Sequence, residues 1–285
     1  MLFEPLFAHA DAQPQTIAIH DDRGSYTYQQ LAAMAAGLGM YLSFQTDKPR
    51  VGLLVPASAG FVASFFGTLL AGKSVVPINY LLGDREIAHI IADSGIDTVV
   101  TIPLLAARLK DHPIKIVDLL ALPSAPPAAI TPRFPQVNRD DMAVLLYTSG
   151  TSGLPKGVVL TYGNFQSDMD AAIEHANLQK RHMFLGIIPL FHSFGITATM
   201  LAPIQLGATV AYLARFSGPG TLAGNHAAGN AHRSAIGQIV ELRGGTNALL
   251  SQFVAMVSHG VRSNGHSGSA KICDEPFLGS HGQQG

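Results

Sequence analysis

Residues 147–157 read Tyr147-Thr148-Ser149-Gly150-Thr151-Ser152-Gly153-Leu154-Pro155-Lys156-Gly157, and they continue from the apolar run Met142–Tyr147. An apolar run of this length, bounded by turn-forming residues, predicts a fully buried β-strand. A loop that leaves a buried strand lies at the edge of a sheet, where α/β proteins normally bind their ligands. The sequence therefore predicts an α/β fold with a ligand site at this loop.

The composition of the loop is typical of a phosphate-binding site. Gly150 and Gly153 allow the backbone to turn tightly and to bring its N–H groups close to phosphate oxygens. Pro155 stiffens the far side, and Lys156 supplies a positive charge for the outer phosphates of a nucleotide. Further donors are the hydroxyls of four residues: Thr148, Ser149, Thr151 and Ser152.

Other interpretations of these motifs are weaker. A Walker-type loop needs Gly directly before its Lys, and Pro155 occupies that position. No G-x-G-x-x-G dinucleotide motif occurs in the chain. A serine hydrolase built on His192 and Ser193 would need G-x-S-x-G, and Phe191 stands in place of the first Gly. The structural alternative is an ordinary surface turn rich in Ser, Thr and Gly.

Strand-like and helix-like segments alternate through residues 1–145. This rhythm predicts a mostly parallel sheet with helices on both faces. Predicted strands cover residues 16–20, 26–28, 51–55, 74–78 and 98–101, and predicted helices cover residues 28–43, 61–71 and 84–94. After the loop we expect a strand at 157–160 and a helix from the N-cap Asn164 to Ala176. Two further strands are expected at 183–188 and 209–214, with a helix at 196–206 between them.

Two segments lack a periodic pattern. Residues 122–135 carry five prolines and predict an irregular connector. From about Ser217 to Gly285 neither a helical nor a strand period persists. We therefore divide the chain into a partial domain at residues 1–216 and an irregular tail at 217–285. The tail is either flexible or the product of a lost reading frame, and the break in the α/β pattern favours the second interpretation.

Bulk properties restrict the possible partners and compartment. A net charge of −1 gives no indication of a nucleic-acid partner. The single cysteine, Cys273, and the absence of a signal-peptide pattern at the N-terminus predict a cytoplasmic protein. Two uncharged stretches, 51–72 and 183–214, are long enough to span a bilayer, but prolines and polar residues divide them into shorter elements. We therefore expect no transmembrane segment.

The loop resembles the signature of the adenylate-forming (AMP-binding) superfamily, which includes acyl-CoA synthetases, luciferases and peptide-synthetase adenylation domains. Three further segments are similar to motifs of this family and occur in the same order. They are Tyr26-Thr27-Tyr28-Gln29-Gln30-Leu31, Leu70-Ala71-Gly72-Lys73-Ser74-Val75-Val76-Pro77-Ile78-Asn79 and Pro189-Leu190-Phe191-His192-Ser193-Phe194-Gly195. The third is similar to a segment common in the fatty-acyl branch, and the resemblance covers roughly residues 1–216.

The resemblance implies the N-terminal portion of the large domain of that fold, and a two-step reaction. ATP and a carboxylate, here a fatty acid, give an acyl-adenylate and pyrophosphate, and a thiol of coenzyme A or of an acyl-carrier protein then takes the acyl group. Thr148 to Lys156 would hold the β- and γ-phosphates, with Mg²⁺ at Thr151, and His192 would stand at the carboxylate pocket. For His192, a histidine at a strand end that is hydrogen-bonded to the backbone is the structural alternative.

Some positions depart from the family pattern. Relatives usually carry His-Arg-Asn after the loop, where this chain has Tyr162-Gly163-Asn164. After Phe216 we find none of the family's later motifs for adenine, ribose and the catalytic lysine. We therefore expect that this chain alone does not turn over. A non-catalytic nucleotide-binding fragment is the alternative function.

Overall fold

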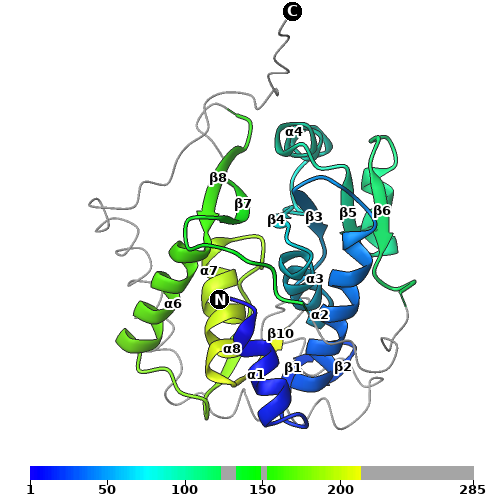
Figure 1. The fold of residues 1–285 in the computed structure, drawn as a ribbon. Coiled ribbons are helices and arrows are strands. Elements are labelled where there is room, and N and C mark those ends of the chain that lie inside the picture. The colour runs from blue at the N-terminus through cyan, green and yellow to red at the C-terminus, as the bar shows by residue number, and fades with distance from the viewer. Residues whose placement is uncertain (123–132, 149–152, 213–285) are drawn as a thin grey trace, which may run out of the picture.

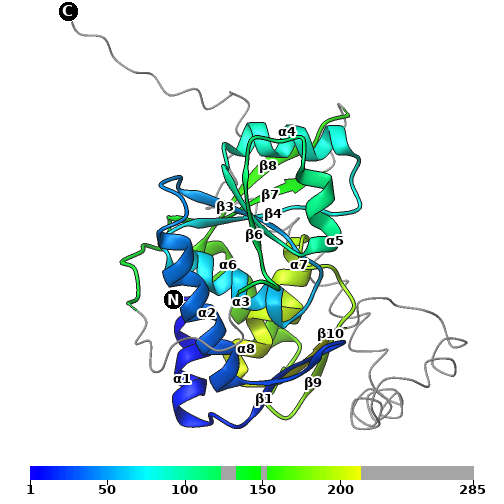
Figure 2. The same ribbon diagram turned by 90° about the vertical axis from the view of Figure 1, so that its right-hand side faces the viewer.

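The structure is a computed structural model, and it describes residues 1–122, 133–148 and 153–212 (Figure 1). Most of the proline-rich connector, residues 149–152 of the loop and the tail beyond residue 212 lie outside the described residues. The described chain forms two sheets with helices between and around them (Figures 1 and 2).

The larger sheet has six strands in the order β6-β5-β3-β4-β7-β8. Neighbouring strands are parallel except β7 and β8, which form an antiparallel pair around the loop. The strands are β3 (Arg50–Leu54), β4 (Ser74–Pro77), β5 (Thr98–Thr101), β6 (Lys115–Asp118), β7 (Met142–Thr148) and β8 (Lys156–Thr161). The predicted, mostly parallel α/β fold is thus confirmed.

The smaller sheet is built from segments far apart in the chain. Its order is β2-β1-β10-β9, and β10 pairs in parallel with both β1 and β9. Its strands are β1 (Ile17–Asp21), β2 (Gly24–Thr27), β9 (Met183–Gly186) and β10 (Thr209–Tyr212). The sequence pattern indicated these strands but did not indicate that they leave the main sheet.

Helices cover both faces of the six-stranded sheet. On one face lie α4 (Asp84–Ser94) and α5 (Pro103–Ala106), which continues into a 3₁₀ turn at Ala107–Leu109 (Figure 2). Between the two sheets lie α2 (Tyr28–Ser43), α3 (Ala59–Leu70) and a third helical segment (Figure 2). This segment runs continuously through α7 (Ser193–Ile196), the π-helical turn η2 (Thr197–Leu201) and α8 (Ala202–Leu206). Two outer helices, α1 (Glu4–Ala12) and α6 (Tyr162–His175), complete the described fold.

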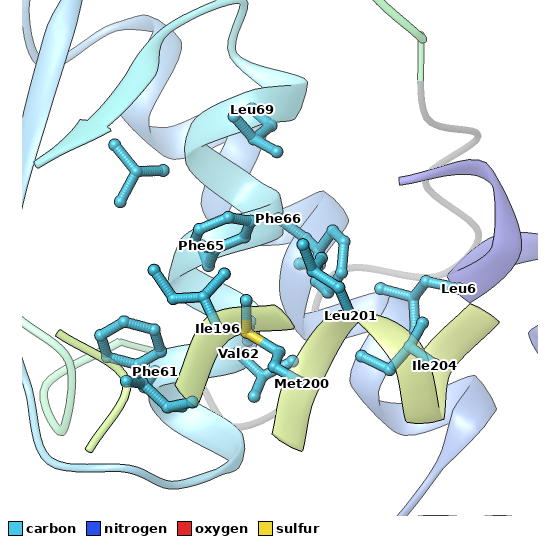
Figure 3. Packing of buried hydrophobic residues seen from close by; sticks show 14 of the residues in the cluster. Leu6, Phe61, Val62, Phe65, Phe66, Leu69, Ile196, Met200, Leu201 and Ile204 are labelled. Atoms are coloured by element: carbon cyan, nitrogen blue, oxygen red, sulfur yellow. The ribbon is translucent and has the colours of Figure 1, made fainter. Parts of the chain in front are cut away.

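Alternate residues of the central strands face opposite cores. Leu53 and Val75 join the core between the sheets, whereas their neighbours Leu54 and Val76 join the core under α4. This period of two is what the pleat of a strand buried on both faces requires. In the core between the sheets, apolar side chains of α3 pack against those of the α7–α8 segment, among them Phe61, Val62, Phe65, Phe66, Ile196, Met200 and Leu201 (Figure 3).

Helix ends follow local sequence signals. The predicted bounds of α2 and α4 match those observed. The predicted N-cap Asn164 was wrong, because Thr161 caps α6 and Asn164 stands three residues later in the capping box. The sequence analysis also missed α1 and β6. No helix in the described part of the chain combines the length and the apolar character needed to cross a membrane.

Candidate phosphate-binding loop and active site

The β7–β8 hairpin sets the two ends of the candidate phosphate loop. Its ladder pairs Tyr147 with Gly157 and Thr148 with Lys156, so the loop leaves and re-enters at the same point of the sheet. Because β4 and β7 are parallel, paired at Val75 and Val144, the carboxyl end of β4 lies at the same edge as Thr148. This edge is where α/β sheets bind ligands, as the sequence predicted.

Four of the predicted loop residues are described, and the hairpin brings them to this edge: Thr148, Gly153, Pro155 and Lys156. Gly153 has φ +91°, a conformation that favours glycine, and no atom of another described residue lies within 4 Å of where a side chain would begin. Lys156 is exposed, and its ammonium makes no hydrogen bond or ion pair with another described residue. Ser149, Gly150, Thr151 and Ser152 lie outside the described residues, and their roles stay predictions.

Helix α4 contacts both strands that lead into the loop. The Tyr147 hydroxyl donates a 2.6 Å hydrogen bond to Oδ2 of Asp93. One turn earlier on the helix, Nε2 of His89 lies 2.9 Å from the carbonyl oxygen of Pro155. Burial and then the hydrogen bond to Asp93 raise the pKa of Tyr147, so its hydroxyl stays a donor at neutral pH. His89 and Asp93 were not predicted as residues of this site; their i, i+4 spacing on a predicted helix indicates that they share one face.

His192 stands where the chain enters α7. It occupies the N-cap position with extended backbone, and its amide donates to the carbonyl of Pro189. Its ring packs edge-to-face on Phe191, with centroids 4.7 Å apart. Although the residue is exposed at the surface, partial burial lowers the pKa of His192 and favours the neutral imidazole. The alternative of a side chain bonded to backbone receives no support from the described hydrogen bonds.

An aromatic contact connects the His192 segment to the sheet edge. The Phe191 ring packs edge-to-face on Tyr80, with centroids 5.2 Å apart and an interplanar angle of 86°. Tyr80 follows β4, whose carboxyl end lies beside β7, and it packs against the same apolar cluster as Tyr147. The described ends of the candidate phosphate loop and the His192 segment are thus both connected to the carboxyl edge of this sheet, through different elements.

A single glycine sets the close turn of the His192 segment. A Cβ on Gly195 would overlap the carbonyl oxygen of Pro189 and lie 3.0 Å from its carbonyl carbon. The turn brings Phe191 into the core, where it is buried, while His192 remains at the surface. The serine-hydrolase alternative, which the sequence already disfavoured, gains no support, since no hydrogen bond joins Ser193 to a histidine in the described chain.

Comparison with known proteins shows which family the chain resembles in sequence. The family described as AMP-binding enzyme matches residues 6–228. A feruloyl-CoA synthase of Amycolatopsis sp is 30% identical over 211 residues, covering 70% of this chain and 41% of the relative. A long-chain-fatty-acid–CoA ligase of Bacillus subtilis (strain 168) is 28% identical, covering 59% of this chain and 37% of the relative.

A solved structure is similar to this chain in fold. The O-succinylbenzoate coenzyme A synthetase of Bacillus subtilis in complex with AMP is similar with a TM-score of 0.67 and 25% identity, covering 75% of this chain and 56% of that one. The chain thus spans about two-fifths of the length of the curated relatives it matches. Its fold is that of the N-terminal part of adenylate-forming enzymes, and the chain belongs to the AMP-binding enzyme family.

Proposed function

We propose that this chain forms the ATP-phosphate-binding part of an enzyme that activates a carboxylate as an acyl-adenylate and transfers the acyl group to a thiol. One observation carries the proposal. The exposed residues Thr148 and Lys156 pair in the β7–β8 ladder at the carboxyl edge of the main sheet, and the sequence that joins them contains Gly150 and Gly153. A lysine charge beside glycine backbone N–H groups is the donor set that a triphosphate needs.

Each loop residue has a proposed task. Backbone N–H groups around Gly150 and Gly153 bind phosphate oxygens, with hydroxyl donors from Thr148, Ser149, Thr151 and Ser152. Lys156 stabilises the charge that develops on pyrophosphate as the carboxylate attacks the α-phosphorus. The Thr151 hydroxyl is the proposed protein ligand for Mg²⁺, which when bound neutralises phosphate charge; hydroxyl and phosphate oxygens are hard donors of the kind that this ion prefers.

His192 is the proposed residue at the carboxylate pocket. A neutral ring, favoured by its lowered pKa, borders a carboxylate-binding region without forming a fixed ion pair that would oppose nucleophilic attack. The buried Phe191 beside it gives the segment an apolar flank. This flank and the similarity to a long-chain-fatty-acid–CoA ligase favour a fatty acid as substrate, with coenzyme A as acceptor and an acyl-carrier protein as the alternative.

Calorimetric titration with ATP, pyrophosphate and AMP in magnesium buffer tests the proposal. If the loop binds the β- and γ-phosphates, ATP and pyrophosphate bind measurably and AMP binds at least about tenfold more weakly, a difference of about 1.4 kcal/mol. Equal affinities for ATP and AMP would contradict the proposed role of the loop.

A non-catalytic nucleotide-binding role is the second candidate, because binding of phosphates by the loop does not by itself require turnover. Release of pyrophosphate from ATP on addition of a carboxylate distinguishes the two. A panel of a long-chain fatty acid, malonate and ferulate samples the acids named for three relatives: a long-chain-fatty-acid–CoA ligase, a malonate–CoA ligase of Arabidopsis thaliana and a feruloyl-CoA synthase. Release with one acid supports the ligase; ATP binding without release supports the second candidate.

A further inference from the structure

Helix α4 holds the two ends of the phosphate loop at two separate points. His89 and Asp93 are four residues apart and therefore lie on the same face of the helix. Asp93 accepts from the hydroxyl of Tyr147, next to the residue that begins the loop. His89 contacts the carbonyl of Pro155, next to the residue that ends it. One rigid element thus contacts both strands directly at the loop.

The helix is itself firmly placed at its N-terminal end. Arg108, from the 3₁₀ turn after α5, donates to the carbonyl oxygens of Tyr80 and Leu82, each at 2.7 Å, and to Oδ1 of Asp84 at 2.6 Å. The side chain of Glu86 accepts from the amide of Gly83 in a capping arrangement. These bonds fix the turn from which α4 starts.

The middle and the end of the helix are also fixed. Three isoleucines of α4 are buried in the core against the main sheet: Ile87, Ile90 and Ile91. At the C-terminus, Arg50 donates to the carbonyl of Ser94, and Gly95 ends the helix in the left-handed conformation, φ +66°. A helix held in this way cannot slide along the sheet, so its polar contacts can define the position of the loop ends.

We propose that His89 and Asp93 are positioning residues that hold Thr148 and Lys156 at the separation needed to bind nucleotide phosphates; this inference rests on the proposed function of the loop. Thr148 and Lys156 form the last pair of the β7–β8 ladder before the loop. Fixing Tyr147 and Pro155, the residues next to this pair, preorganises Thr148 and Lys156 and lowers the entropy that they lose on binding a ligand. The two side chains touch no ligand themselves and act through Tyr147 and Pro155.

Peptide-resolved hydrogen exchange of the unliganded full chain tests the geometric part. His89→Ala and Asp93→Ala are expected to speed exchange about tenfold in peptides covering 142–148 and 156–161 and to leave β3 and β5 unchanged. His89→Gln and Asp93→Asn retain a donor and an acceptor and are expected to restore most protection. Arg85→Ala is the matched control, because this exposed residue of α4 makes no described hydrogen bond.

Ligand affinity tests the functional part. His89→Ala and Asp93→Ala are each expected to raise the Kd for ATP and for pyrophosphate about fivefold to tenfold, with rescue by His89→Gln and Asp93→Asn and no change in Arg85→Ala. The Kd for AMP, which lacks the outer phosphates, should change less than about twofold.

The outcomes separate this inference from the proposed function. If the unsubstituted chain prefers ATP to AMP but both alanine variants bind ATP as tightly, the positioning role is wrong and the proposed function stands. If the alanine variants lose affinity for ATP and AMP equally, or the conservative variants fail to rescue, the contacts serve general stability and the inference is overturned. If the unsubstituted chain does not prefer ATP, the proposed function fails, and the positioning role fails with it.

Discussion

The phosphate loop and the His192 segment border the same sheet edge, but different interactions hold them in place. The loop ends are held by strand register and by polar contacts from one helix, through Tyr147 and Pro155. The His192 segment is held by close packing, with Gly195 against the carbonyl of Pro189 and Phe191 against Tyr80. In the first region the described side chains Thr148 and Lys156 are exposed, whereas in the second a Cβ at Gly195 would overlap the carbonyl oxygen of Pro189.

Because of this difference, we expect substitutions in the loop to change mainly ligand affinity and substitutions in the His192 segment to change mainly the free energy of unfolding. An exposed loop residue should affect ligand affinity and leave the free energy of unfolding nearly unchanged, because its side chain packs against little. A residue in the packed segment should affect stability first, since overpacking cannot be relieved cheaply in a dense interior. Four substitution experiments test the contrast, in decreasing order of expected effect.

The largest effect is expected from Gly195→Ala. The new methyl group overlaps the carbonyl of Pro189, so the free energy of unfolding should fall by about 3 kcal/mol. In the matched variant Gly153→Ala the new methyl group meets no atom of a described residue within 4 Å, so we expect mainly backbone strain at φ +91°, about 1 kcal/mol. Urea unfolding of both variants measures the difference, and equal losses would remove the proposed contrast.

Lys156→Ala should lower ATP affinity about 30-fold, because a charge-assisted contact to phosphate contributes roughly 2 kcal/mol. Its free energy of unfolding should stay within about 0.5 kcal/mol of the unsubstituted value, since the side chain is exposed. Lys110→Ala, another exposed lysine far from the loop in sequence, serves as the charge-matched control. Equal ATP affinity in both variants would show that Lys156 has no special role.

A double-mutant cycle on Tyr80 and Phe191 should give a coupling free energy of about 1 kcal/mol, as expected for an edge-to-face aromatic pair. The variants are Tyr80→Leu, Phe191→Leu and the double substitution, each compared by urea unfolding. Additive losses would mean that the contact between the sheet edge and the His192 segment contributes nothing beyond ordinary burial.

The smallest effect concerns pH. Burial lowers the pKa of folded His192 from its usual 6.5, so in the window just below pH 6.5 the unfolded chain binds more protons than the folded chain. Stability should therefore fall as the pH drops from 7.5 to 5.5, and His192→Gln should lose less over this range. Because His192 is exposed at the surface, the difference should be small. A steeper pH dependence in His192→Gln than in the unsubstituted chain would contradict the lowered pKa.

The parts of the fold that could be predicted from sequence are those with strong local patterns, such as helix ends. The bounds of α2 and α4 were predictable because Thr27 caps the first helix and Gly95 ends the second. The error at Asn164 arose because Thr161 and Asn164 are both good capping residues, and only the backbone shows which one is extended. The separation into two sheets depends on the pairing of β1 with β10, nearly 200 residues apart, which local periodicity does not encode.

In the candidate site, too, contacts between residues distant in the sequence could not be predicted. Thr148 to Lys156 could be proposed as a phosphate site because glycine, hydroxyl and lysine side chains in one short segment have a direct chemical meaning, and this assignment stays a prediction. The contacts of His89, Asp93 and Arg108 could not be predicted, since the partner of each lies far away in the sequence; the i, i+4 spacing of His89 and Asp93 shows only that they share a helix face. Contacts between distant segments are set by how the helices pack on the sheet, which periodicity alone does not specify.

The most direct test of the central claim is to locate the outer phosphates of bound ATP on the chain. An ATP derivative with an acyl group on its γ-phosphate transfers that group to a lysine amine held beside the phosphate, and mass spectrometry identifies the lysine. We predict acylation of Lys156, suppressed by excess ATP or pyrophosphate and not by AMP. Acylation at other lysines only, or labelling of Lys156 that neither competitor suppresses, would contradict the assignment of residues 148–156 as the ATP-phosphate loop.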